Sequence, residues 1–206
     1  MSEVSFKERV RLTIIEMSKQ YKEKYVDYEY LICSSGFKNK PYYIVDAEKD
    51  NYQHLTGVHS ALSASDFFEK CYSGTLDEND FDFNKNGQSE KEVKGTVRRK
   101  IKVLPNMMTM FENAVNAEED FQKNKVSCSF ATADGKCTLG FTDTNKARPK
   151  SLISGNELSN PAQVELVLRK KAGNDFFDEI VYGDKVSLTQ YREKIEDILS
   201  EDLKNT

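Results

Sequence analysis

Both histidines of the 206-residue chain lie in one short segment, residues 51–60. A histidine side chain exchanges its proton near neutral pH, so general acid–base catalysis most often uses it. His54 is followed by Leu55, by Thr56 with its hydroxyl group, and by Gly57. The second histidine, His59, comes five residues after His54. Two histidines so close together, beside a hydroxyl and a glycine, indicate a candidate catalytic site in this segment.

A second segment, residues 146–156, carries more cations and hydroxyl groups than a connection of its length needs. Arginine is a planar two-point donor for phosphate, lysine is a mobile point charge, and glycine lets a backbone N–H approach an anion. A histidine and such a cluster are what metal-independent RNA cleavage requires. A base takes the 2′-OH proton, an acid protonates the leaving oxygen, and a cation stabilises the phosphorane. The polar residues here are Lys146, Arg148, Lys150, Ser151, Ser154 and Asn156.

Each segment also has a simple structural interpretation. His54 could be a hydrogen-bonded structural residue, and residues 148–150 could form a solvated turn. Ser60 and Ser63 are weaker candidates as nucleophiles, since only His59 lies near them in the sequence.

The composition is that of an ordinary globular protein, with 38% hydrophobic and 31% charged residues. A formal net charge of -4 and a pI near 5.4 give no electrostatic reason to expect nucleic-acid binding by the chain as a whole. The stretch Arg98-Arg99-Lys100-x-Lys102, with residues 169–171, could still form a local cationic face. The alternative, which we favour, is a solvated helix face and strand end.

The chain shows no run of about 20 apolar residues and no basic-then-apolar order at its start, so we expect no membrane span and a cytoplasmic location. Its four cysteines lack metal-ligand spacing and are expected to be free thiols, although Cys128 and Cys137 could face each other across a hairpin. We expect neither a metal nor another cofactor.

Periodicity predicts the elements of the first half. Apolar residues at steps of three and four predict a helix over residues 6–21, capped by Ser2 or Ser5. Residues 28–33 and 42–45 should form an antiparallel hairpin, and residues 63–74 a short helix that begins at Ser63 and ends at Gly74. Residues 77–95 are expected to be an exposed connection, before a helical region over 97–114 with a break at Pro105.

The second half is expected to be rich in strands. Asp134-Gly135 predicts a hairpin between residues 126–132 and 137–142, with the 146–156 segment following as a loop. Strands over 164–170 and 176–182 and a C-terminal helix complete the pattern. The prediction is one α+β domain over residues 1–206 with a mainly antiparallel sheet, a helical N-terminal extension of about 25 residues and a C-terminal helix at about 187–204.

Two sets of residues resemble motifs of a known family. The run from Tyr52 to Val58, followed by residues 62–71, resembles an "F-x-HLTG-V … SA-x-DF-Y-x-K" pattern, and residues 148–156 resemble an "RPKSLL-x-G" element. Both belong to an HLTG-containing group of phage- and prophage-encoded barnase–EndoU–colicin–RelE-like nucleases. Tyr52 stands where the pattern has Phe, and Ile153 where it has Leu. The landmarks span about half of the chain.

The resemblance implies a small α+β nuclease-like fold acting on RNA without a metal. It implies that His54 is the general acid or base and that Thr56 contacts the substrate or its phosphate, with Gly57 beside them. It further implies that Arg148 and Lys150 are phosphate-stabilising cations. Gly57, Ser151, Ser154 and Asn156 are then candidate substrate-binding residues.

Two hypotheses follow. The first is an RNA-cleaving enzyme of a phage or other mobile element, with RNA as substrate and a host protein or a cognate inhibitor as candidate partners. The second is a non-catalytic module on the same fold that binds RNA, a nucleotide or a host defence protein, and the acidic pI mildly favours it. The sequence does not fix the oligomeric state.

Overall fold

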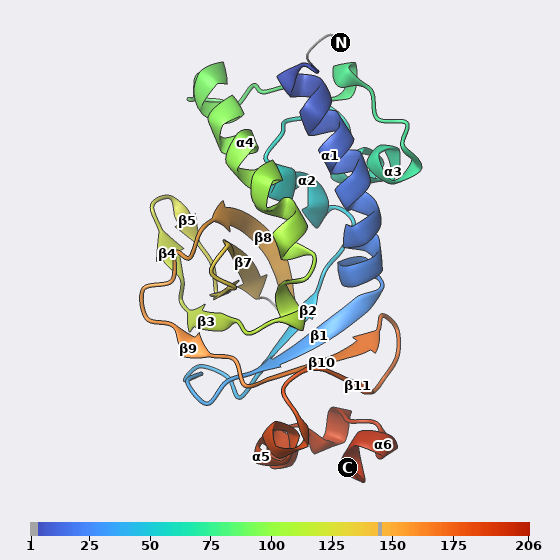
Figure 1. Cartoon of the computed structure of the whole chain (residues 1–206), viewed down its shortest axis with the longest axis vertical. Helices are drawn as coiled ribbons and strands as arrows, with labels where there is room; N and C mark the ends of the chain where they lie inside the picture. Colours follow the sequence, from blue (N-terminus) through green and yellow to red (C-terminus); the bar gives the residue numbers. More distant parts are fainter. Residues whose placement is uncertain (1–3, 144–145) are drawn as a thin grey trace.

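The computed structural model describes residues 4–143 and 146–206, and its centre is a strongly curled, mostly antiparallel sheet with helices on both faces (Figure 1). The strand order is β11-β10-β1-β2-β8-β7-β6-β3-β9. The predicted α+β class is confirmed. The helices are α1 (Phe6–Tyr21), α2 (Asn51–Thr56), α3 (Ala64–Ser73), α4 (Glu90–Met107), α5 (Lys185–Ile195) and α6 (Glu201–Lys204). The sheet strands are β1 (Tyr28–Cys33), β2 (Tyr43–Asp46), β3 (Asn116–Glu119), β6 (Phe130–Ala133), β7 (Cys137–Asp143), β8 (Ala147–Ser154), β9 (Ala162–Gln163), β10 (Leu166–Lys171) and β11 (Glu179–Tyr182).

The sheet consists of two antiparallel halves that meet at β2 and β8. These two strands are parallel, with Val45 in register with Ala147. On one side, β1 lies between β2 and β10. On the other side, β8 pairs with β7 in a long antiparallel ladder, interrupted by a bulge between Gly140 and Phe141. The two candidate segments come from different halves, because α2 follows β2 and residues 146–156 include β8.

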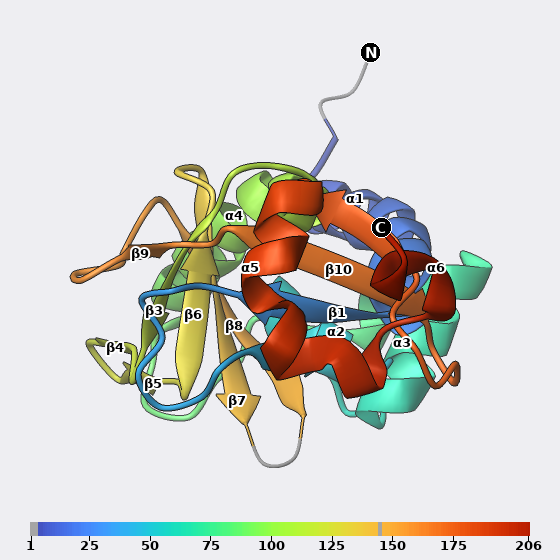
Figure 2. The same cartoon turned by 90° about the horizontal axis from the view of Figure 1, so that it is seen from below.

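Helices α1 to α4 cover one face of the sheet, and α5 and α6 cover the other face beneath β1 and β10 (Figures 1 and 2). The main core lies under α1 to α4, and a second core lies under α5. A third, small cluster includes Phe121, Cys128 and Ala131. It lies beside a hairpin of two short strands, β4 (Gln122–Lys123) and β5 (Val126–Ser127).

The elements with strong local patterns form as predicted. Ser5 caps α1 by accepting a hydrogen bond from the Glu8 N–H, and the predicted apolar stripe of α1 is buried. Ser63 caps α3, and Gly74 ends it with a left-handed backbone. The β1–β2 and β6–β7 hairpins are also confirmed.

Three boundaries differ from the prediction. The connection predicted over 77–95 is shorter, because Ser89 and Glu92 form a capping box that starts α4 at Glu90. Its aromatic residues Phe81 and Phe83 are buried. Pro105 lies inside the last turn of α4 and does not break it, and the C-terminal helix is interrupted between α5 and α6.

The 146–156 segment was predicted to be a loop, and this is wrong. Residues Ala147–Ser154 form β8, which is paired along its length with β7.

The four cysteines are buried and free. Among the helices within the described ranges, none is long and apolar enough to span a membrane.

Candidate functional site

The HLTG segment is the end of a short helix. His54 lies exposed in the last turn of α2, which ends at Gly57 with a φ of 79°. Thr56 is fully buried, and its hydroxyl donates to the carbonyl oxygen of Gln53 at 2.7 Å. The imidazole of His54 is thus exposed to solvent, whereas the hydroxyl of Thr56 is engaged in a hydrogen bond within the last turn of the helix.

The side chain of Lys100, on α4, packs against this turn. Its Nζ atom donates to the main-chain oxygen of His54 at 2.6 Å. A Cβ atom added at Gly57 would lie 2.8 Å from Lys100 Cδ, so the lysine side chain lies flat against the glycine. Burial, together with the charge of Lys85, lowers the pKa of Lys100 to about 8. A half-buried amine of lowered pKa therefore lies at the same turn as the exposed imidazole.

The sequence favours a solvated helix face over residues 98–102, and at Lys100 this prediction is wrong, because Lys100 is half-buried against Gly57. The signal was present. Residues at steps of four, three, four and three form the buried stripe of α4, and a lysine occupies the middle position. A charged residue within an apolar stripe is unusual and indicates a specific partner for its side chain. The stripe consists of Val93, Val97, Lys100, Leu104 and Met107.

Arg148 reaches the other end of α2. Its guanidinium forms an ion pair with Glu48, whose backbone N–H donates to the Asn51 side chain at the start of the helix. Helix α2 packs against β8 and α4. Six residues of helix span about 9 Å, so the Arg148 contact and His54 lie roughly one short helix apart.

Lys150, two residues after Arg148 on β8, contacts the β4–β5 hairpin. Its Nζ atom donates to the Ser127 main-chain oxygen of the β4–β5 hairpin at 2.7 Å. It lines a polar cavity of about 300 Å³ together with Cys128 and Thr142. Cys128 belongs to the small cluster rather than to the main core, and Thr142 is the register partner of Arg148 on β7, so Arg148 lies on the same face of the sheet as this cavity.

The remaining predicted contacts follow β8 away from α2. Ser151 pairs with Gly140, and Ser154 pairs with Cys137 at the far end of the strand. Strands rise about 3.3 Å per residue, so Ser154 lies about 20 Å from Arg148. The Asn156 side chain accepts a hydrogen bond from the Leu158 N–H. Helix α2, which carries His54, packs against β8, which carries Arg148, while Ser154 and Asn156 lie at and beyond the far end of that strand.

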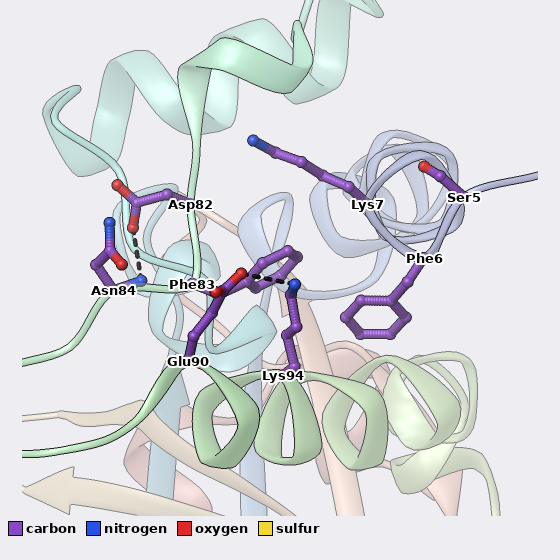
Figure 3. Close-up of a pocket in the computed structure, with 8 residues that line it drawn as sticks. All are labelled: Ser5, Phe6, Lys7, Asp82, Phe83, Asn84, Glu90 and Lys94. Atoms are coloured by element: carbon purple, nitrogen blue, oxygen red, sulfur yellow. Dashed lines mark hydrogen bonds and ion pairs between the residues drawn. The ribbon is translucent and has the colours of Figure 1, made fainter.

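His59 has a different environment. Its Nδ1 atom lies 3.0 Å from Asp82 Oδ1, and the two residues also bridge through their backbones. Burial raises the pKa of Asp82, but the Asn84 N–H and His59 outweigh it and hold that pKa below its usual value. Asp82 also lines a cavity of about 390 Å³ between the start of α1 and the first turns of α4 (Figure 3). Glu90 and Lys94 form an ion pair in its wall.

The comparisons with known proteins give one match. No curated protein and no solved structure shows significant similarity to the chain. A family model described as "phage-Barnase-EndoU-ColicinE5/D-RelE like nuclease4" matches residues 13–205. This match covers nearly the whole chain and includes both α2 and β8. The chain belongs to this phage-barnase–EndoU–colicin–RelE-like nuclease family.

Proposed function

We propose that the protein is a metal-independent endoribonuclease in which His54 is the general base that takes the 2′-OH proton. The observation that carries this proposal is the exposed imidazole on α2, a helix that packs directly against the strand carrying Arg148. Membership of a nuclease-like family supports the same chemistry. The products are a 2′,3′-cyclic phosphate and a free 5′-hydroxyl.

Arg148 is the proposed phosphate-binding cation. A guanidinium binds a phosphate through two parallel hydrogen bonds, as it binds a carboxylate. The Glu48 carboxylate occupies this position in the structure. The scissile phosphate would replace Glu48, so binding of substrate requires that ion pair to open.

The other predicted residues take lesser roles. The hydroxyl of Thr56 is used inside the helix end, so this residue and Gly57 shape the turn that presents His54. Lys150 and Ser151 could contact the RNA backbone farther along the strand. Neither acts on the scissile phosphate in this proposal.

A non-catalytic binding module is the second candidate, and the Arg148–Glu48 ion pair favours it. An arginine already neutralised by a carboxylate is not available to stabilise a transition state unless substrate displaces that carboxylate. A binding module would hold RNA without cleaving it and would tolerate the loss of His54.

The deciding experiment uses labelled RNA oligonucleotides and purified protein, with EDTA present throughout. Wild-type protein should cleave the RNA, and an oligonucleotide with a 2′-deoxy sugar at the cleaved position should resist cleavage. His54→Ala should lower the rate by about 10²–10⁴, the usual contribution of a general acid or base.

His59→Ala is the matched control, because it removes the chain's other exposed histidine. It should cleave at nearly the wild-type rate, and both variants should melt near the wild-type temperature. Binding without cleavage by all three proteins would instead establish the binding module.

A further inference from the structure

The placement of Lys100 is more specific than a structural role requires. A lysine near a helix C-terminus can stabilise the last carbonyl groups from the solvent, with its ammonium fully hydrated. Lys100 instead extends from the buried stripe of α4, and burial disfavours its charged form. A hydrophobic residue at this position would avoid that penalty. The side chain therefore places an amine at the His54 turn at some expense of stability.

The glycine of the turn fits this placement. Gly57 has a left-handed backbone, which glycine adopts without strain, and its missing Cβ leaves the space that the Lys100 side chain fills. At Gly74, which ends α3 with almost the same backbone, nothing lies within 4 Å of the equivalent position. Close approach of a side chain is thus particular to the His54 turn.

We propose that Lys100 is the general acid of the reaction and protonates the leaving 5′-oxygen while His54 acts as the base. This inference rests on the proposed ribonuclease function and adds its second proton-transferring group. One ammonium proton is held by the His54 carbonyl, and two others remain for the substrate.

The proposed step balances in atoms and charge. The 2′-O–H bond breaks and its proton moves to the His54 imidazole, while the 2′-oxygen forms a bond to phosphorus. The P–O5′ bond then breaks, and an ammonium proton of Lys100 moves to the departing oxygen. Imidazolium and amine return to their starting states by exchange with water. At neutral pH an amine of lowered pKa is still protonated, yet it releases its proton more readily than an ordinary lysine.

A substrate whose leaving atom needs no proton tests this role. Two RNAs are compared, one natural and one with sulfur in place of the bridging 5′-oxygen at the cleaved position. Lys100→Met should cleave the natural RNA about 10²–10⁴ times more slowly than wild type and the sulfur-containing RNA at nearly the wild-type rate. His54→Ala should be slow on both, since the 2′-OH proton must still be removed.

Two further variants separate catalysis from structure. Lys100→Arg keeps the charge and can still donate to the His54 carbonyl, but a guanidinium does not give up its proton. It should behave like Lys100→Met on both RNAs. Lys102→Met removes an exposed lysine two residues along the same helix and should cleave both RNAs like wild type.

The outcomes are distinct. Full activity of Lys100→Arg on the natural RNA would overturn the general-acid role and leave a cationic or structural one. Folded Lys100 variants that remain slow on the sulfur-containing RNA would also overturn it. Wild-type protein that cleaves neither RNA would overturn the ribonuclease function itself, whereas active wild type with active Lys100→Met would overturn only this inference.

Discussion

The Nζ atom of Lys100 donates to the main-chain oxygen of His54 at 2.6 Å, which joins α4 to the end of α2. The contact is made to the backbone, so it leaves the imidazole of His54 free to face solvent. The ammonium of Lys100 is therefore held against the backbone that carries the His54 side chain, without a bond to the imidazole itself.

Gly57→Ala should disturb this arrangement more than its backbone strain alone explains. The new Cβ would meet Lys100 Cδ at 2.8 Å and push the lysine away from the His54 carbonyl. A non-glycine residue with a left-handed backbone costs about 1–2 kcal/mol in itself. Gly74→Ala is the matched control, since its φ of 76° is nearly the same and its surroundings are open. Urea unfolding should show similar losses for the two variants, since the flexible end of a lysine can move aside at little cost, and RNA cleavage should fall in Gly57→Ala alone. Equal cleavage rates in the two variants would contradict a role for the close packing of Lys100.

Glu48→Gln should strengthen substrate binding under the proposed function. The amide no longer competes as an anion for the Arg148 guanidinium, so phosphate meets a free cation. We expect a lower KM with kcat little changed, measured by steady-state cleavage at fixed ionic strength. Glu69→Gln, which removes the partner of Lys49 in another exposed ion pair, should leave KM unchanged. A KM that rises in Glu48→Gln would argue against phosphate binding at Arg148.

Lys100 should make stability depend on alkaline pH. Its pKa is about 8 in the folded protein and near 10.5 in an unfolded chain. Between these values the unfolded chain binds more protons than the folded one, so stability should rise as pH increases through this window. Urea unfolding of wild type at pH 7.5 and 10 should show this component, and Lys100→Met should lack it while Lys102→Met retains it. A pH dependence shared by all three proteins would show that other groups cause it.

The Lys70–Asp80 ion pair should stabilise the protein until the pH becomes acidic. The hydrogen bond from Lys70 holds the pKa of Asp80 below its usual value of 3.8, helped by the Asp77 N–H. This contribution is present above pH 3.8 and is lost as the pH falls through the lower folded pKa. Lys70→Met should destabilise the protein by about 1 kcal/mol at pH 7 and by less near pH 3, measured by thermal unfolding. Lys49→Met, at a more exposed ion pair, serves as the control.

Elements with a complete local pattern could be predicted from the sequence. Helix α1 has both its cap at Ser5 and its apolar stripe in sixteen consecutive residues, and the β6–β7 hairpin has Asp-Gly at its turn. Strand β8 could not be recognised in this way. Its cations and Pro149 are typical of a loop, and its identity as a strand depends on pairing with β7 and β2.

The candidate site divides in the same way. His54 and Arg148 were predicted from residue type and motif, and the structure adds that α2 packs against β8. Lys100 was overlooked because its neighbours Arg98, Arg99 and Lys102 suggested a solvated face. Its place in the apolar stripe of α4 distinguishes it from them in the sequence, and the structure adds its partners, Gly57 and the His54 carbonyl. Ser154 lies far from Arg148 because the extended backbone of a strand separates them. A loop, which the sequence favours here, could have brought the two residues together.

The parallel pairing of β2 with β8 has a consequence for synthesis of the protein. Val45 and Ala147 lie about 100 residues apart, so the seam of the sheet is among its longest-range connections. A nascent chain that ends before β8 has His54 and Lys100 but no Arg148. Under the proposed function, such a chain lacks its phosphate-binding cation while it is still attached to the ribosome. Cleavage of RNA would therefore begin only after translation has passed Arg148.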